Sequence, residues 1–308
     1  MKTLVSQFTN QLSDALKIGH SAVLNQSKKE IKNIVITGLG GSGIGGKIAT
    51  QLRSKQLRVP VVINNDYTLP QFVSENSLII VSSFSGNTEE TLEALTTAQA
   101  KNAEIACITS GGKLADIANE MGYNLIVLPD AFSPRAMLTY SVVQQLFLFH
   151  HYGLIDDSFI KEVENTVEML NAEEDQIKDL AHQASLTLHT RTTIAYAESS
   201  LEGVITRFRQ QINENAKCLG WEHVIPEMNH NELVGWAGGK EEYAVVFFRS
   251  DYEHVRSAVR MDITKEIVQK HTKSILEFKA KGESFIAQSF YHILLGDWIS
   301  VYLAELYK

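Results

Sequence analysis

Short apolar segments rich in β-branched residues alternate with helix-like segments along most of this chain. In the first half the strand-like segments are NIVITG (33–38), VPVVIN (59–64), SLIIVSSFS (77–85), AEIACITS (103–110) and NLIVLP (124–129). They are continuous apolar runs, a pattern typical of strands that are buried on both faces. Strands joined by helices favour a parallel sheet with helices on both sides. We therefore predict a doubly wound α/β domain.

The same alternation returns in the second half, with strand-like segments TTIAYAES (192–199), EYAVVFFRS (242–250) and KSILEFKA (273–280). Helical patterns cover residues 201–219, 254–270 and 283–308. A chain of 308 residues is longer than the chains that usually fold around a single hydrophobic core. Gly153 closes a long apolar helix that begins at Pro134, and an acidic helical stretch follows it. We expect an N-terminal domain of residues 1–153 and a C-terminal domain of residues 154–308, each a doubly wound parallel sheet.

The glycine-rich stretch ITGLGGSGIGGKIA (36–49) follows the first predicted strand and matches two phosphate-binding patterns incompletely. Gly38, Gly40 and Gly43 satisfy the dinucleotide pattern G-x-G-x-x-G. The P-loop pattern runs from Gly41 through Lys47 and fails at Ile48, where a hydroxyl should bind magnesium. Both patterns place backbone N–H groups against an anion at a helix N-terminus. The stretch predicts phosphate binding more firmly than nucleotide binding, and a tight turn without a ligand is the structural alternative.

Charge limits the class of ligand. The net charge of −8 gives no general attraction for nucleic acid or acidic lipid, so we expect neither a nucleic acid nor a membrane as partner. Residues 31–65 contain no Asp or Glu, and this segment holds Lys32, Lys47, Arg53, Lys55 and Arg58. A phosphorylated ligand would be held by this local positive charge.

A second polar loop, SSFSGNTEET (82–91), follows the third predicted strand and opens a helix. Ser83, Ser85 and Thr88 place hydroxyl groups where a helix start presents spare N–H groups. Ordinary helix capping explains these residue types equally well. However, two such loops at the carboxyl ends of neighbouring strands lie at the edge where open α/β sheets bind ligands.

Three further candidates each have an ordinary structural interpretation beside the functional one. Arg135 follows an expected N-cap, Ser133, and a cation there opposes the helix dipole by about 0.3–1 kcal/mol unless an anion joins it. Glu214 falls on the polar face of its predicted helix, where a solvated salt-bridge partner is the common finding. His230 lies between two asparagines in a loop, which is typical of a surface histidine.

Cys107 and Cys218 suit a reducing compartment without a disulfide framework. The N-terminus lacks the continuous apolar core of a signal peptide, and no run approaches the ~20 apolar residues of a membrane span. We therefore expect a cytoplasmic protein. The ten histidines include no H-E-x-x-H or comparable spacing, so we expect no metal site.

Five motifs, in this order and spanning both halves, resemble those of the bifunctional phosphoglucose/phosphomannose isomerases of the sugar isomerase (SIS) fold family. They are GLGGSGIGG (38–46), SSFSGNTEETL (82–92), PRAMLTYSV (134–142), NENAK (213–217) and PEMNHNELVGW (226–236). The first two occur in many sugar-phosphate-binding domains, whereas NENAK and NHNE at this separation distinguish this family from the other domains. The resemblance implies two SIS domains per chain, a homodimer, and sites at domain and subunit interfaces. It also implies a phosphate-binding set of Gly41, Ser42, Ser83, Ser85 and Thr88.

The resemblance further implies interconversion of glucose 6-phosphate, and of mannose 6-phosphate, with fructose 6-phosphate through an enediolate. Glu214 would be the base that carries a proton between C1 and C2, Arg135 would lie beside the enediolate, and His230 would open the sugar ring from the neighbouring subunit. Such a reaction requires no redox cofactor and no metal. The family also uses a lysine near the C-terminus. Here the pattern departs, because the only lysine after Lys281 is the terminal Lys308, to which the resemblance would assign that role.

Two other functions stay open on the sequence. A nicotinamide-dependent enzyme needs an acidic residue after its second strand to bind the ribose, and Asp66 lies at about the expected distance. Such a fold does not call for the second hydroxyl-rich loop. A non-catalytic sugar-phosphate sensor would use both loops but leaves Glu214 and His230 without a task.

Overall fold

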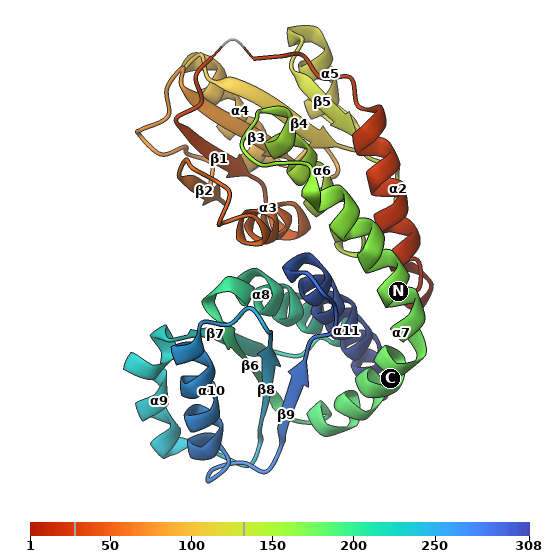
Figure 1. The fold of residues 1–308 in the computed structure, drawn as a ribbon, viewed down its shortest axis with the longest axis vertical. Helices are drawn as coiled ribbons and strands as arrows, with labels where there is room; N and C mark the ends of the chain where they lie inside the picture. The colour runs from red at the N-terminus through yellow and green to blue at the C-terminus, as the bar shows by residue number, and fades with distance from the viewer. Residues whose placement is uncertain (28, 132) are drawn as a thin grey trace. The chain divides into compact units, whose positions relative to one another are not determined.

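The computed structural model describes residues 1–27, 29–131 and 133–308. Its contacts divide the chain into two compact units. The N-terminal unit is Asn10–Lys161, and the C-terminal unit combines Met1–Thr9 with Glu162–Lys308. Each unit has one all-parallel sheet with helices on both faces (Figure 1). The prediction of two parallel-sheet α/β domains is confirmed.

This division differs in two places from the one expected between residues 153 and 154. The chain passes from one unit to the other inside helix α7 (Ser158–Leu188), which continues without a break. The leading segment belongs to the C-terminal unit, because α1 (Lys2–Val5) packs on α11 (Phe285–Leu306). Phe8 also contacts Phe290 edge to face, with ring centroids 6.0 Å apart. A boundary inside a continuous helix, and packing against a segment far away in the chain, cannot be recognised from the neighbouring sequence.

The N-terminal sheet has five parallel strands in the order β2-β1-β3-β4-β5. They are β1 (Asn33–Thr37), β2 (Val61–Asn64), β3 (Ser77–Ser82), β4 (Glu104–Thr109) and β5 (Asn124–Val127). The helices are α2 (Phe8–Ser21), α3 (Gly40–Leu52), α4 (Glu89–Ala100), α5 (Gly112–Met121) and α6 (Leu138–His151). Every residue of the central strand β3 is buried, as its continuous apolar run predicts.

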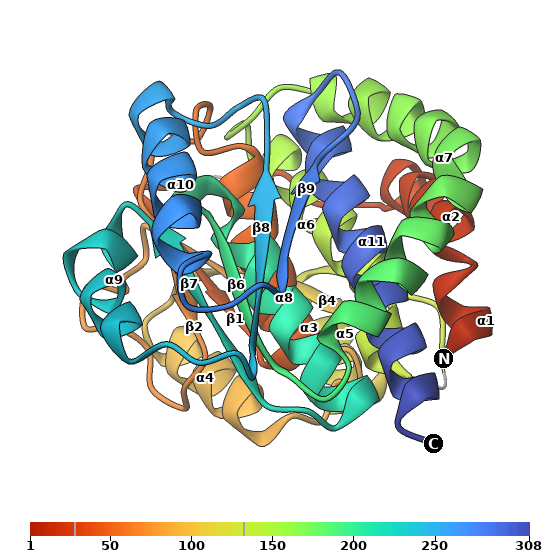
Figure 2. The same ribbon diagram turned by 90° about the horizontal axis from the view of Figure 1, so that it is seen from below.

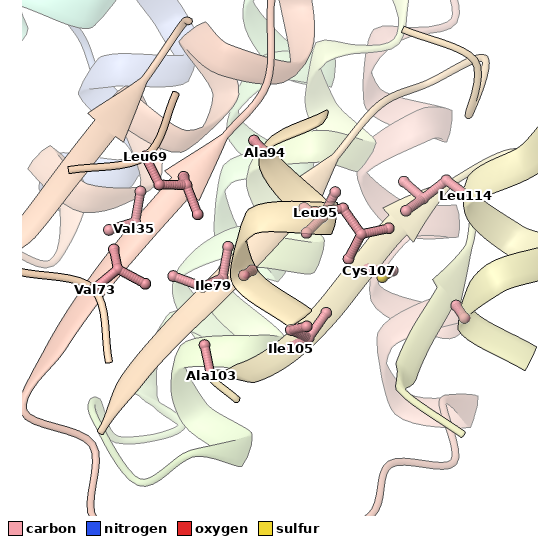
Figure 3. Close-up of a cluster of buried hydrophobic side chains, with 13 residues drawn as sticks. Val35, Leu69, Val73, Ile79, Ala94, Leu95, Ala103, Ile105, Cys107 and Leu114 are labelled. Carbon is pink, nitrogen blue, oxygen red and sulfur yellow. The ribbon is translucent and has the colours of Figure 1, made fainter. Parts of the chain in front are cut away.

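One face of this sheet packs against α4 and α5 through a compact apolar core (Figure 3). Val35, Ile79 and Cys107 contribute from the strands, and Leu95 and Leu114 reach the core from the helices. Burial raises the pKa of the Cys107 thiol to about 12. This cysteine therefore stays protonated and unreactive at neutral pH.

On the opposite face, α3 lies close to both β1 and α6, and two glycines permit the approach. A Cβ added to Gly46 would lie 2.7 Å from the Cγ2 atom of Ile36 in β1. A Cβ added to Gly45 would overlap the Ser141 side chain of α6. A larger residue at either position would push α3 away from the sheet, together with the loop that precedes the helix.

The C-terminal sheet has four parallel strands in the order β7-β6-β8-β9. They are β6 (Thr192–Glu198), β7 (Gly220–Ile225), β8 (Tyr243–Arg249) and β9 (Ile275–Lys279). Helix α10 (Val255–Val268) covers one face, over Tyr196 and Phe247 (Figure 1, Figure 2). Helices α8 (Glu202–Gln211) and α11 cover the other face, where the Phe248 ring lies 5.1 Å from both Phe208 and His292.

Two features of the C-terminal unit depart from the sequence-based expectation. Strand β7 is not among the expected strands, because GWEHVI is a partly exposed edge strand without a continuous apolar run. The helix expected over residues 201–219 ends earlier. After α8 the chain forms a π-helical turn, η3 (Ile212–Ala216), and Lys217 then adopts a left-handed conformation with φ of 60°. Such turns occur frequently at functional sites.

Candidate active site

The first phosphate-loop candidate lies between β1 and α3. Gly41 and Ser42 form the first turn of α3 and are partly exposed, so their side of the helix N-terminus is open to a ligand. The backbone closes tightly here, since a Cβ on Gly43 would overlap the Gly38 carbonyl. The amide of Asn65 donates to that same carbonyl over 2.6 Å. The turn is therefore held in a shape that presents helix N–H groups to an anion.

The second loop connects β3 to α4 and brings its hydroxyl groups together. The Oγ atom of Ser83 and the Oγ1 atom of Thr88 are 2.8 Å apart. Thr88 is the N-cap residue of α4, but its side chain makes no capping hydrogen bond. The Oγ atom of Ser85 accepts a hydrogen bond of 3.3 Å from the backbone N–H of Asn87. Simple helix capping therefore does not account for Thr88.

The loop after β4 braces this second loop from behind. The Ser110 hydroxyl donates to the Phe84 carbonyl over 2.7 Å, and the Leu114 N–H donates to the Gly86 carbonyl over 3.0 Å. Gly86 has a φ of +67°, and a Cβ at this position would overlap the Gly111 carbonyl. Only glycine fits this conformation and this contact.

Both loops start at the carboxyl ends of neighbouring strands, since Thr37 of β1 pairs with Val81 of β3. A Cβ on Gly38 would lie 2.5 Å from the Ser82 carbonyl, so the two loops touch at their bases. The strand order reverses direction between β1 and β3, and open α/β sheets bind ligands at this switch point.

Arg135 lies in η1 (Pro134–Ala136), a 3₁₀ turn rather than the first turn of a long helix. The helix expected from Pro134 starts four residues later, at Leu138, and Ser133 makes no side-chain cap. The Pro134 carbonyl is 3.7 Å from the position of a Cβ on Gly41. The structure thus brings the Arg135 turn beside the first loop.

Glu214 is exposed at the middle of η3, and the polar residues of the NENAK motif hold its backbone. The Asn213 amide donates to the Cys218 carbonyl over 2.7 Å, and the Asn215 amide donates to the Ser300 hydroxyl over 2.9 Å. Lys217 donates to the Glu214 carbonyl over 2.8 Å. The motif fixes a turn that presents one carboxylate.

His230 ends the 3₁₀ turn η4 (Glu227–His230) and is exposed, while both of its neighbours are anchored. The Asn229 amide donates to the Thr264 hydroxyl of α10 over 2.8 Å. The Asn231 side chain accepts a hydrogen bond of 2.5 Å from the N–H of Glu232. The histidine is presented outward from a firmly held loop.

Glu232, in the short helix α9 (Glu232–Gly235), is a residue that sequence reasoning missed. Its carboxylate accepts hydrogen bonds from the Tyr196 hydroxyl, from Trp221 Nε1 over 2.8 Å and from His223 Nδ1 over 2.7 Å. Burial, followed by the charge of Glu232, raises the pKa of Tyr196. These donors tie the His230 segment to β6 and β7. The NHNE motif contains Glu232, but its partners are 9 to 36 residues away in the chain.

Lys308 is the last residue, beyond the end of α11, and it is exposed. Within the described ranges, no group of three or more His, Cys, Asp and Glu side chains could hold a metal ion. Nor does any helix in the part of the chain that the structure describes have the length and apolarity to span a membrane.

Comparison with known proteins gives the family. Residues 29–154 match the SIS domain family, and residues 177–308 match the bacterial phospho-glucose isomerase C-terminal SIS domain. A bifunctional phosphoglucose/phosphomannose isomerase from Caldicellulosiruptor bescii is 38% identical over 99% of this chain and 93% of its own length. The chain belongs to the bifunctional phosphoglucose/phosphomannose isomerase family.

A second member of the bifunctional phosphoglucose/phosphomannose isomerase family, from Aquifex aeolicus, is 35% identical over 90% of this chain and 85% of its own length. Among solved structures, the C-terminal domain of glucosamine-fructose-6-phosphate aminotransferase from Francisella tularensis superposes with a TM-score of 0.78. The two chains are 15% identical, and the match covers 99% of this chain and 95% of that one. This likeness shows a shared fold. The roles of individual residues stay predictions.

Proposed function

We propose that this chain is an aldose–ketose isomerase that interconverts glucose 6-phosphate and mannose 6-phosphate with fructose 6-phosphate. The observation that carries the proposal is the 38% identity, over nearly the whole chain, to a bifunctional phosphoglucose/phosphomannose isomerase. Both halves of the chain are covered, including the segments that hold Glu214 and His230. Aldose–ketose isomerisation gives a role to residues of both halves, whereas phosphate binding alone gives a role only to the loops of the N-terminal unit.

The phosphate would bind at the β1 and β3 loops of the N-terminal unit. Gly41 offers its N–H group at the start of α3, while the Ser42 N–H already donates to the Leu39 carbonyl over 3.1 Å, so Ser42 would contribute its hydroxyl group. Ser83, Ser85 and Thr88 also offer hydroxyl groups. The protein has a net charge of −8, so its overall charge does not attract a phosphate dianion. Hydrogen bonds from these donors act at short range and can bind the phosphate at this one place. The phosphate would anchor the sugar without taking part in the chemistry.

In the proposed reaction, Glu214 takes the proton from C2 of the open-chain aldose, the C2–H electron pair forms the C1–C2 double bond, and the π electrons of the C1 carbonyl move onto O1 to give the enediolate. The same carboxylate then returns the proton to C1, while the O2 hydroxyl proton passes to O1 and the C2 carbonyl forms, which gives the ketose. Arg135 would oppose the negative charge on the enediolate oxygens. His230 would protonate the ring oxygen when the ring opens. Because the enediolate has lost the configuration at C2, one base can serve both aldoses. The role given to Lys308 stays a prediction.

The proposal includes a homodimer and a cytoplasmic location. The homodimer rests on the family resemblance, and exposed His230 would complete the site of a partner subunit. The cytoplasmic location is supported by Cys107 and Cys218, which are both free thiols.

A coupled assay tests the function. Purified protein is given fructose 6-phosphate, and glucose 6-phosphate is followed with an NADP-dependent dehydrogenase. In a second arm, fructose 6-phosphate is followed from mannose 6-phosphate. We expect turnover in both arms. A mannose rate at background would reduce the function to glucose isomerisation. No turnover in either arm, with thermal stabilisation by fructose 6-phosphate, would point to a regulatory binding protein, and stabilisation by NAD to a nicotinamide enzyme.

A further inference from the structure

We propose that Ser300 of α11 is a positioning residue for Glu214. It accepts a hydrogen bond from Asn215 and thereby fixes the turn that carries the carboxylate. This inference rests on the proposed function, in which Glu214 is the proton-transfer base.

The turn needs an external support because a π-helical turn is not a regular continuation of α8. Glu214 lies at the centre of η3, and its backbone direction determines where the exposed carboxylate points. A proton-transfer base must hold its geometry closely, since a displacement of about 1 Å can lower the rate by about 100-fold. The anchoring of the adjacent residue, Asn215, therefore controls the position of the base.

The contact between Asn215 and Ser300 has a defined direction. The Ser300 hydroxyl donates its single proton to the Asp297 carbonyl over 2.7 Å, one turn earlier in α11. Its oxygen is then an acceptor toward the Asn215 Nδ2 atom, 2.9 Å away. Ser300 is fully buried, so water does not compete for this bond. The amide of Asn215 is held in one orientation.

The α11 segment that carries Ser300 is itself fixed against α8. Asp297 is buried, and its two carboxylate oxygens accept from Arg207 Nη2 over 3.0 Å and from Gln211 Nε2 over 2.9 Å. The helices come close at Gly296, where an added Cβ would lie 3.0 Å from the Phe208 ring. Because this part of α11 is held in place, its hydrogen bond through Ser300 also holds the turn that carries Glu214.

On its other side the turn is held within its own segment of the chain. Arg209 binds the Asn213 side-chain oxygen over 3.2 Å and also pairs with Glu222 of β7. These contacts join α8, η3 and β7, which are adjacent in sequence, whereas Ser300 lies 85 residues from Asn215. The Ser300 contact ties η3 itself to α11, next to the bonds by which Arg207 and Gln211 of α8 hold Asp297.

The test is Ser300→Ala, with Ser185→Ala as the matched control. Ser185 is also a fully buried helical serine of the C-terminal unit, and its hydroxyl also donates to the carbonyl three residues earlier, over 2.7 Å. We expect Ser300→Ala to lower kcat by about 10- to 100-fold while KM changes little, because the phosphate site is untouched. Exchange of the substrate C2 proton with deuterated water should fall in parallel. Ser185→Ala should leave kcat unchanged at a similar loss of thermal stability.

Two further variants make the outcome decisive. Ser300→Thr retains the hydroxyl and should keep kcat near that of the parent. Because Asn215→Ala and Ser300→Ala break the same contact, the double variant should lose no more activity than either single variant. Parental kcat in a folded Ser300→Ala protein, or equal losses in both serine variants, would overturn the inference.

If the parent is active and Glu214→Gln is inactive, such a result leaves the proposed function intact. If Glu214→Gln retains activity, the assigned base is wrong instead.

Discussion

The hydroxyl oxygens of Ser83 and Thr88 lie 2.8 Å apart at the carboxyl end of β3. Thr88 occupies the N-cap position of α4 without capping it, so its hydroxyl turns toward the loop interior. Together with the adjacent β1 loop, the pair forms a set of donors at the switch point of the sheet. We expect this set of groups to bind the phosphate of the substrate.

Replacing Thr88 by Val should therefore impair binding more than chemistry. A hydrogen bond to a charged group contributes about 1.5–3 kcal/mol, so the KM for fructose 6-phosphate should rise by about 10-fold or more. The phosphate is bound alike in the ground and transition states, so kcat should fall much less. Thr96→Val is the control, because Thr96 is an exposed threonine of the same helix whose hydroxyl donates to the Leu92 carbonyl over 3.1 Å. Equal KM values in both variants would contradict the phosphate assignment.

Glu214→Gln should remove catalysis without unfolding the protein. The amide is nearly isosteric but can neither accept nor return the C2 proton, and loss of a general base lowers turnover by about 100- to 10,000-fold. Because Glu214 is exposed, the free energy of unfolding should change by less than about 1 kcal/mol. Steady-state kinetics and deuterium exchange at C2 measure the effect, with Glu202→Gln of the preceding helix α8 as control. Turnover within a few-fold of the parent would place the base elsewhere.

Glu232→Gln should loosen the His230 loop. The carboxylate accepts from three donors, and an amide would bring its own donor hydrogens against them. Leaving such donors unsatisfied should lower the free energy of unfolding by about 1–3 kcal/mol. Turnover of the cyclic substrate should also fall, and the fluorescence of Trp221 should shift as its indole N–H loses its partner. In the control, Glu227→Gln, one exposed hydrogen bond to Asn231 changes, and we expect neither effect.

His292 should make the protein less stable in mild acid. It is fully buried, and burial lowers its pKa to about 4, while one ring nitrogen lies 2.9 Å from the Arg249 carbonyl. The unfolded chain protonates this histidine near pH 6.5 and the folded chain does not until about pH 4, so stability falls as the pH drops through this window. The loss amounts to about 3 kcal/mol in total.

His292→Gln tests this, because its amide can reach the Arg249 carbonyl but does not titrate. Urea unfolding at several pH values between 7 and 4 should show a shallower decline for the variant than for the parent. His182→Gln, at an exposed histidine of the same unit, should leave the parental slope unchanged. Identical slopes for His292→Gln and the parent would show that other groups govern acid stability.

The sequence by itself determined the parts that depend on neighbours in the chain. The run SLIIVS predicted a buried parallel strand, and β3 is buried at every residue. The glycine-rich turn before α3 and the hydroxyl-rich turn before α4 were predicted because strand, turn and helix start lie within a few residues of each other. Loops that follow the carboxyl ends of parallel strands lie at the same edge of the sheet, and the two loops lie side by side there because β1 and β3 are adjacent. Periodicity and turn chemistry are local properties, so they are legible in sequence.

The tertiary structure alone decided the features that join distant segments. No pattern near Glu214 indicates that Asn215 meets Ser300 in another helix, or that Glu232 gathers donors from β6 and β7. The edge strand β7 and the placement of α1 with the C-terminal unit escaped prediction for the same reason. A hydrogen bond forms only when packing brings two groups within about 3 Å. That distance is set by how whole helices and sheets fit together, here by the close approach of Gly296 to Phe208, and by no short stretch of the chain.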